Sequence, residues 1–166
     1  MNTTALLSIG TRIKTLCPTI QHIDLYNNQY LPDAELQANP FSKPAVFIEF
    51  GPTQWDDTND GIQQGEGLLR VHVVIEVYAD TYSLFTLTPV EQQTLLEHYQ
   101  VAQQVHAALQ DFAADGTATA LQRINSIPDH DYDNIIIEVL EYHFRDVDTS
   151  AQPEYETATI RHVVAD

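Results

Sequence analysis

The stretch LLRVHVVIEVY, residues 68 to 78, decides the fold class because apolar and polar side chains alternate along it. One set of alternate positions is aliphatic throughout: Leu69, Val71, Val73, Ile75 and Val77. The other set carries charged and polar groups: Arg70, His72, Glu76 and Tyr78. Alternation with a period of two is typical of an antiparallel strand that buries one of its faces. The stretch therefore predicts a sheet whose apolar face needs a covering layer.

A long amphipathic helix further along the chain can supply that layer. Thr88 is placed to cap it, Pro89 suits the first helical position, and Glu91 completes a capping box. An apolar stripe follows at helical spacing: Leu95, Tyr99, Ala102, Val105, Leu109 and Phe112. Gly116 is expected to stop the helix. We expect this stripe to pack on the aliphatic face of residues 68 to 78.

The remaining elements complete an α+β domain. An N-terminal helix is predicted over residues 4 to 17, ended by Pro18. Its apolar face is expected to contain Leu6, Ile9, Ile13 and Leu16. Stretches with strand character are residues 23–26, 45–50, 68–78, 121–127 and 135–145. This order predicts an antiparallel sheet of about four to five strands, with the N-terminal helix and the long helix packed on one face. Residues 1–147 then form a single domain, and residues 148–166 form a C-terminal arm or edge strand.

The stretch GPTQWDDTNDGIQQGEG, residues 51 to 67, shows no apolar periodicity and is predicted to be a long exposed loop at the tip of a hairpin. Trp55 lies there among polar and acidic neighbours. Two roles are open for it: its ring folds back on its own hairpin, or it anchors another subunit. Ile62 is a second apolar side chain that gains from burial elsewhere. Trp55 and Ile62 are therefore the candidate subunit-interface residues.

The charge of the chain narrows the range of partners. It has 24 acidic and 7 basic residues, a formal net charge of −17. Such a surface repels phosphate and anionic lipid, so neither specific nucleic-acid binding nor membrane binding is expected. The single cysteine, Cys17, cannot form an internal disulfide and is expected to be a buried, inert thiol.

The stretch DHDYDN, residues 129 to 134, is the best candidate for a metal site. Its acids match the first, third and fifth positions of a calcium loop: Asp129, Asp131 and Asp133. The match then fails, because Asn134 stands where glycine is needed and Leu140 stands where the bidentate glutamate belongs. Asp and Asn are common in turns, so we expect a hairpin turn without a metal. A calcium- or other ligand-binding accessory domain that uses this acidic turn remains the alternative.

Other chemistry has weaker support in the sequence. There is no nucleophile elbow, no phosphate-binding loop and no metalloprotease motif, so we expect neither an enzyme nor a bound cofactor. Gly65-Glu66-Gly67 is too short to be a phosphate-binding signature. Three histidines fall on predicted strands and form a metal site only if those strands are neighbours: His72, His143 and His162.

The order of elements resembles that of the tail completion (tail terminator) and related head–tail neck proteins of long-tailed bacteriophages and prophages. The matching segments are ALLSIGTRIKTL, AVFIEF, LLRVHVVIEVYAD, TPVEQQTLLEHYQVAQQVHAALQDF and LQRINSIPDHDYDNIIIEVLEYHFRDV, which together extend over residues 4 to 147. The family has no invariant catalytic motif, so the resemblance rests on the order of the elements and on the general character of their sequences.

The resemblance implies a non-enzymatic virion subunit that forms a ring, commonly a hexamer, at the head-proximal end of the tail. The implied partners are further copies of the chain, the tail tube and the neck proteins. The implied location is the virion, with assembly in the host cytoplasm. DNA passes through such a ring without being held, and negative charge on the lumen prevents phosphate contacts.

The acidic turn at residues 129 to 134 gives a first testable prediction. Calcium should leave the thermal stability of the protein unchanged, measured by circular dichroism during a titration. A ligand at a hundred times its dissociation constant stabilises the folded state by about 2.7 kcal/mol. A rise of several degrees in the melting temperature, lost in Asp131→Asn, would show that the turn binds the cation.

Overall fold

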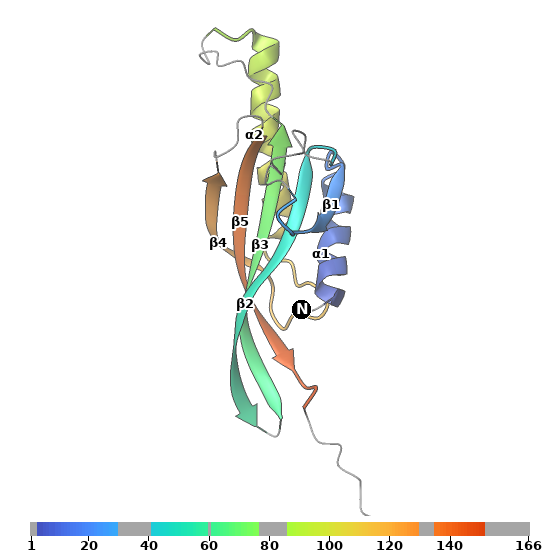
Figure 1. The fold of residues 1–166 in the computed structure, drawn as a ribbon, viewed down its shortest axis with the longest axis vertical. Helices are drawn as coiled ribbons and strands as arrows, with labels where there is room; N and C mark the ends of the chain where they lie inside the picture. Colours follow the sequence, from blue (N-terminus) through green and yellow to red (C-terminus); the bar gives the residue numbers. More distant parts are fainter. Residues whose placement is uncertain (1–2, 30–40, 60, 77–85, 130–134, 152–166) are drawn as a thin grey trace, which may run out of the picture.

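The computed structural model describes residues 3–29, 41–59, 61–76, 86–129 and 135–151. Two helices and five strands make up these parts: α1 (Thr3–Leu16), β1 (His22–Leu25), β2 (Ala45–Asn59), β3 (Ile62–Glu76), α2 (Pro89–Leu109), β4 (Gln122–Asp129) and β5 (Ile135–Asp148). The strands form one sheet in the order β1-β2-β3-β5-β4, and both helices lie against one face of it (Figure 1). The predicted α+β class is confirmed.

The sheet is mixed rather than wholly antiparallel. β2, β3, β5 and β4 pair antiparallel, with β3 between β2 and β5. β1 instead pairs parallel with β2, from His22 opposite Ala45 to Leu25 opposite Ile48. The predicted short strand at residues 23–26 is therefore present, but its direction corrects the expectation of a purely antiparallel sheet.

The predicted loop at residues 51 to 67 is wrong, because this stretch is the paired continuation of β2 and β3. Pairing runs from Thr53 opposite Gly67 to Asn59 opposite Ile62, beyond a bulge between Phe50 and Thr53. A bulge is one of the few places in a sheet that accept proline, which explains Pro52 in the middle of β2. Apolar periodicity is missing because the helices do not cover this part of the sheet (Figure 1). Without a buried face, the strands carry no alternating pattern.

The long helix matches its predicted start more closely than its end. Thr88 and Glu91 form the capping box, with Thr88 Oγ1 accepting from the Glu91 backbone N–H at 3.3 Å. The helix stops at Leu109, ahead of the expected Gly116. Its first turns extend beyond the end of the sheet (Figure 1). Tyr99 is exposed instead of packed as predicted.

The core lies between the helices and the sheet. The aliphatic positions of β3, namely Leu69, Val71, Val73 and Ile75, are buried together with Val101, Val105, Ala108 and Leu109 of α2. The predicted packing of stripe on strand is confirmed for Val105 and Leu109, with Ala102 and Phe112 partly buried against the same core, whereas Val101 and Ala108 were not predicted. Val77 and the Leu95 side chain lie outside the described parts. α1 contributes buried apolar side chains at a spacing of four: Ala5, Ile9, Ile13 and, just after the helix, Cys17. Leu16, predicted to face the core, is half exposed.

The face of the sheet opposite the helices has a smaller apolar cluster. It consists of Ala45, Phe47, Val74, Ile135 and Ile137, with Tyr26, Phe41 and Val139 packed against it.

None of the helices described here is long and apolar enough to cross a membrane. β5 continues through Asp148, so the predicted boundary at residue 147 falls within a strand, and residues 152–166 lie outside the described parts.

Leu109 gives a test of the helix-on-sheet packing. Its side chain is fully buried, so Leu109→Ala should lower the free energy of unfolding by about 2 to 5 kcal/mol through lost burial and a residual cavity. Denaturant unfolding followed by circular dichroism measures the change. Leu96→Ala on the same helix is the matched control, because Leu96 is 53% exposed. It should change stability by no more than about 0.5 kcal/mol, and equal losses in both variants would contradict the packing.

Candidate subunit interface

The most distinctive part of the molecule is a projecting end of the sheet, here named the ribbon. It comprises residues 51–59 of β2, 62–67 of β3 and 144–148 of β5. β5 stays paired with β3 to the end, where Asp148 lies opposite Gln63. Figure 1 shows these three strands extending away from both helices, at the opposite end of the long axis from the start of α2. Most of the ribbon therefore lies beyond the helices, although Phe144 at its root is buried with the core.

Two glycines make room for aromatic rings on one face of the ribbon. Gly65 pairs with Trp55 and Gly67 pairs with Phe144. A Cβ atom on Gly65 would lie 2.8 Å from the Trp55 ring, and one on Gly67 would lie 2.5 Å from Phe144 Cζ. Both distances are far below a normal contact, so the rings occupy the space where side chains would stand. Each ring thus packs on the backbone of the neighbouring strand.

Trp55 consequently has a contact within its own ribbon, one of the two roles that the sequence left open. Its residue surface is still 41% exposed, so much of it is free for a second contact. Ile62 is half-buried at the start of β3, and its carbonyl accepts from Thr58 Oγ1 at 2.8 Å. Both residues lie on the ribbon, and their role between subunits stays a prediction.

The side of the ribbon that carries Trp55, here named the Trp55 face, is acidic. Strand alternation and the register place on it Thr53, Trp55, Asp57, Gln63, Gly65, Gly67, Phe144, Asp146 and Asp148. Three of these residues are aspartates and none is basic. A groove of about 360 Å³ lies at the root of this face, lined by Phe50, Trp55, Phe144 and Asp146 among others. This face combines exposed aromatic surface with negative charge.

On the opposite side of the sheet, a row of polar side chains crosses four strands where the ribbon leaves the body. Arg70 Nε donates to Glu141 Oε1 at 2.8 Å, and its Nη1 lies 3.4 Å from Glu49 Oε1. Asn125 Nδ2 donates to Glu141 Oε2 at 3.3 Å. The hydrogen bond from Arg70 holds the pKa of Glu141 below its ordinary value, and the same bond raises the pKa of Arg70. These residues occupy matched register positions, so the row fixes how the strands align.

His72 and His143, the two predicted strand histidines within the described residues, do not lie at a common site. His72 is buried, with Nε2 3.0 Å from Glu49 Oε2 and its ring stacked on Tyr26 at 4.1 Å. Burial lowers the pKa of His72, although the Glu49 carboxylate partly offsets this. His143 instead lies 3.7 Å from Glu66 at the edge of the ribbon. His162 lies outside the described residues.

Only the first residue of the predicted acidic turn lies within the described parts of the chain. Asp129 is the last residue of β4, whereas Asp131 and Asp133 lie outside the described parts. Among the residues that are described, no group of three or more histidine, cysteine or acidic side chains is arranged to hold a metal ion.

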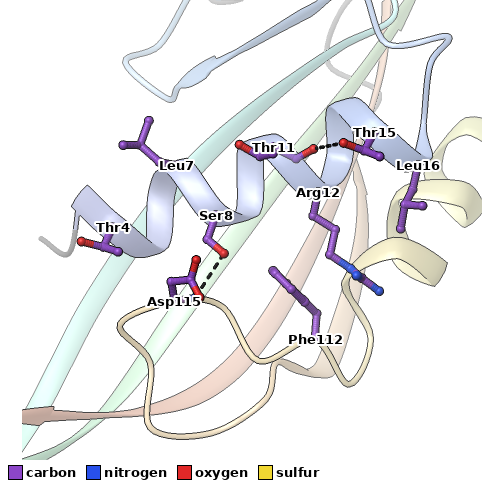
Figure 2. A pocket seen from close by; sticks show the side chains of 9 residues that line it. All are labelled: Thr4, Leu7, Ser8, Thr11, Arg12, Thr15, Leu16, Phe112 and Asp115. Carbon is purple, nitrogen blue, oxygen red and sulfur yellow. Dashed lines mark hydrogen bonds between the residues drawn. The ribbon is translucent and has the colours of Figure 1, made fainter.

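The outward surface of α1 is a second feature that the sequence analysis did not single out. A groove of about 490 Å³ runs along it, with Leu7 and Leu16 exposed and the Arg12 guanidinium 4.5 Å from the centre of the Phe112 ring (Figure 2). Arg12 Nε also donates to the Ala108 carbonyl at 2.6 Å. The Asp115 backbone N–H donates to Ser8 Oγ at 3.1 Å, which ties the loop after α2 to the helix. These contacts hold the residues around the groove in place, and the surface of the groove is partly apolar.

Comparison with solved structures shows a likeness in fold. The chain is similar to a chain of the structure described as "Virion of native gene transfer agent (GTA) particle", with a TM-score of 0.52 at 10% identity. The match covers 88% of this chain and 96% of that chain. No family model and no curated protein matches the sequence. At this identity the likeness shows that the two chains share a fold.

The close packing of aromatic rings on Gly65 and Gly67 gives a paired test of the ribbon. Gly67→Ala should destabilise the protein by about 1 to 3 kcal/mol, because the new methyl group displaces the Phe144 ring. Gly10→Ala is the matched control: its Cβ would meet only Ile23 Cγ2, at 3.8 Å, within α1. It should stabilise by about 0.5 to 1 kcal/mol through helix propensity. Thermal unfolding measures both, and a Gly67→Ala variant as stable as the wild type would contradict the packing of Phe144.

Proposed function

We propose that this protein is a structural subunit of a phage or phage-like virion, of the tail completion or tail terminator kind. In this role it forms a closed ring at the head-proximal end of the tail, and DNA passes through the ring. The observation that carries the proposal is the fold likeness to a chain of a gene transfer agent virion, which extends over nearly the whole of both chains. The partners are then further copies of the chain, the tail tube and the neck proteins, with six copies as the expected ring.

The ribbon supports this role because it offers a surface suited to a neighbour. Cyclic closure uses a heterologous interface, in which one surface of a subunit meets a different surface of the next. The ribbon extends away from the body, so it can reach another subunit without displacing any part of its own core (Figure 1). Trp55 is an exposed aromatic side chain there, and aromatic residues contribute strongly to protein–protein binding.

The charge of the subunit sets the conditions under which rings form. Each copy carries a formal charge of −17, so copies repel one another in dilute, low-salt solution. Salt reduces this repulsion, with a screening length of about 8 Å at physiological ionic strength. The same negative charge suits a passage for DNA, because it gives phosphate groups nothing to bind.

Sedimentation velocity at increasing salt and protein concentration tests the proposal. We expect a monomer or weak oligomer at low salt and closed rings at high salt, high concentration or in the presence of tail tubes. Trp55→Ala should weaken ring formation, whereas Ile124→Ala should not, because Ile124 is 59% exposed on β4 at the far edge of the sheet. A monomer under every condition, with no binding to tail tubes, would refute the proposed role.

A further inference from the structure

The helix α1 differs in charge from the rest of the chain. The chain has 24 acidic residues, yet none lies before Asp24, and α1 carries two basic residues, Arg12 and Lys14. Arg12 is held by Phe112 and the Ala108 carbonyl, while Lys14 is exposed. α1 is therefore the part of the molecule where a strongly acidic surface meets the least repulsion.

The outward surface of α1 is also hollowed on two sides. The groove of Figure 2 lies along the side that faces Phe112 and Asp115. A second groove of about 350 Å³ lies toward β1, lined by Lys14, Ile23 and Asp24 among others. Leu7 and Thr11 line both grooves, and Leu7 is 70% exposed. The exposed side of α1 is thus a ridge of apolar and hydroxyl side chains between two hollows, here named the α1 ridge.

The charges around the α1 ridge balance one another. Arg12 and Asp115 line the first groove, and Lys14 and Asp24 line the second. The surface is therefore close to neutral within a chain of net charge −17. An acidic partner can approach a neutral apolar surface with an exposed lysine more easily than any strongly acidic one.

We propose that the Trp55 face of the ribbon of one copy docks on the α1 ridge of a second copy. This inference rests on the proposed ring-forming function and names the two surfaces that meet. Asp57, Asp146 and Asp148 supply negative charge with no basic residue on the same face, and Lys14 supplies the complementary positive charge. Trp55 and Leu7 supply the exposed apolar surface on the two sides.

The pairing satisfies two further requirements of a ring. The two surfaces are different, so each copy can bind one neighbour through its ribbon and another through its α1 ridge. The charge pairs contribute mainly to the choice of partner surface, whereas burial of aromatic and aliphatic area supplies the affinity. A contact between two α1 ridges would instead bring like positive charge to both sides of the contact and leave both ribbons without a partner.

Cross-linking between single-cysteine variants tests the proposal directly. Asp57→Cys and Lys14→Cys are mixed under conditions where the wild type sediments as an oligomer, and a short bismaleimide is added. We expect a cross-linked dimer in the mixture and little in either variant alone. The native Cys17 is fully buried, so it should not react. Asp57→Cys mixed with Ile124→Cys is the matched control, because Ile124 is exposed on β4, and it should give no dimer.

A charge exchange provides an independent measurement. Lys14→Glu should raise the dissociation constant of the oligomer by up to about fivefold, as for an exposed ion pair. Combining Lys14→Glu with Asp57→Lys should restore the wild-type value. Both positions are exposed, but Lys14 lies in the last turn of α1 and Asp57 accepts a hydrogen bond from Gln63 Nε2 at 2.6 Å. Each change should therefore lower the melting temperature only slightly, which circular dichroism verifies.

The outcomes separate the inference from the function on which it rests. Oligomers that form without a cross-link between positions 57 and 14, or that give an equal cross-link in Lys14→Cys alone, overturn the proposed pairing and leave the ring-forming role intact. A wild type that never oligomerises refutes the ring-forming role itself, and the pairing with it.

Discussion

The continuous pairing of β3 with a strand on each side is the constraint on which the rest of the structure depends. Over its 15 residues β3 has β5 on one side from Gln63 to Glu76, and β2 on the other with two irregularities. Its second half is aliphatic on one face and carries the helices, whereas its first half is polar and contains two glycines. One strand therefore belongs to both the body and the ribbon, and the position of the ribbon follows from the strand that forms the core.

The polar row of Glu49, Arg70, Glu141 and Asn125 lies close to the transition between these two halves. A slip of one residue would move every side chain of a strand to the other face of the sheet. In the body, burial of aliphatic side chains opposes such a slip. In the ribbon that force is weaker, so the packing of Trp55 and Phe144 on glycine backbone has the larger role in setting the register, together with the Arg70 ion pairs where the ribbon leaves the body.

The sequence predicted those parts of the fold whose signals are local. Alternation in residues 68 to 76 and the Thr88 capping box both depend on neighbours in the chain, and both are confirmed. The ribbon was missed because its partners are distant: Gly65 and Gly67 make sense only opposite Trp55 and Phe144. Glycines at alternate positions, close in sequence to an isolated aromatic residue, are the signal that could have predicted the ribbon.

The errors in the helices have equally specific causes. In α1, Ala5 is buried and Leu16 is half exposed, because size alone does not determine which residues face a closely packed sheet, whereas the expected burial of Cys17 is confirmed. In α2, Tyr99 is exposed although it follows the apolar spacing. The start of this helix extends beyond the sheet (Figure 1), and the length of the sheet could not be inferred from the helix. The sequence predicted that the candidate interface residues Trp55 and Ile62 lie together at the tip of one hairpin. The acidic side chains on the same face as Trp55 could be identified only from the strand register.

The position of Trp55 has a consequence for how the molecule can be observed. It is the only tryptophan in the chain, and it sits on the ribbon instead of in the core. Intrinsic fluorescence therefore reports on the projecting strands, whereas far-ultraviolet dichroism is dominated by the body. Comparing the two signals distinguishes loosening of the ribbon from global unfolding without any added label. Because the indole is partly in water, its emission wavelength also responds when another surface covers it.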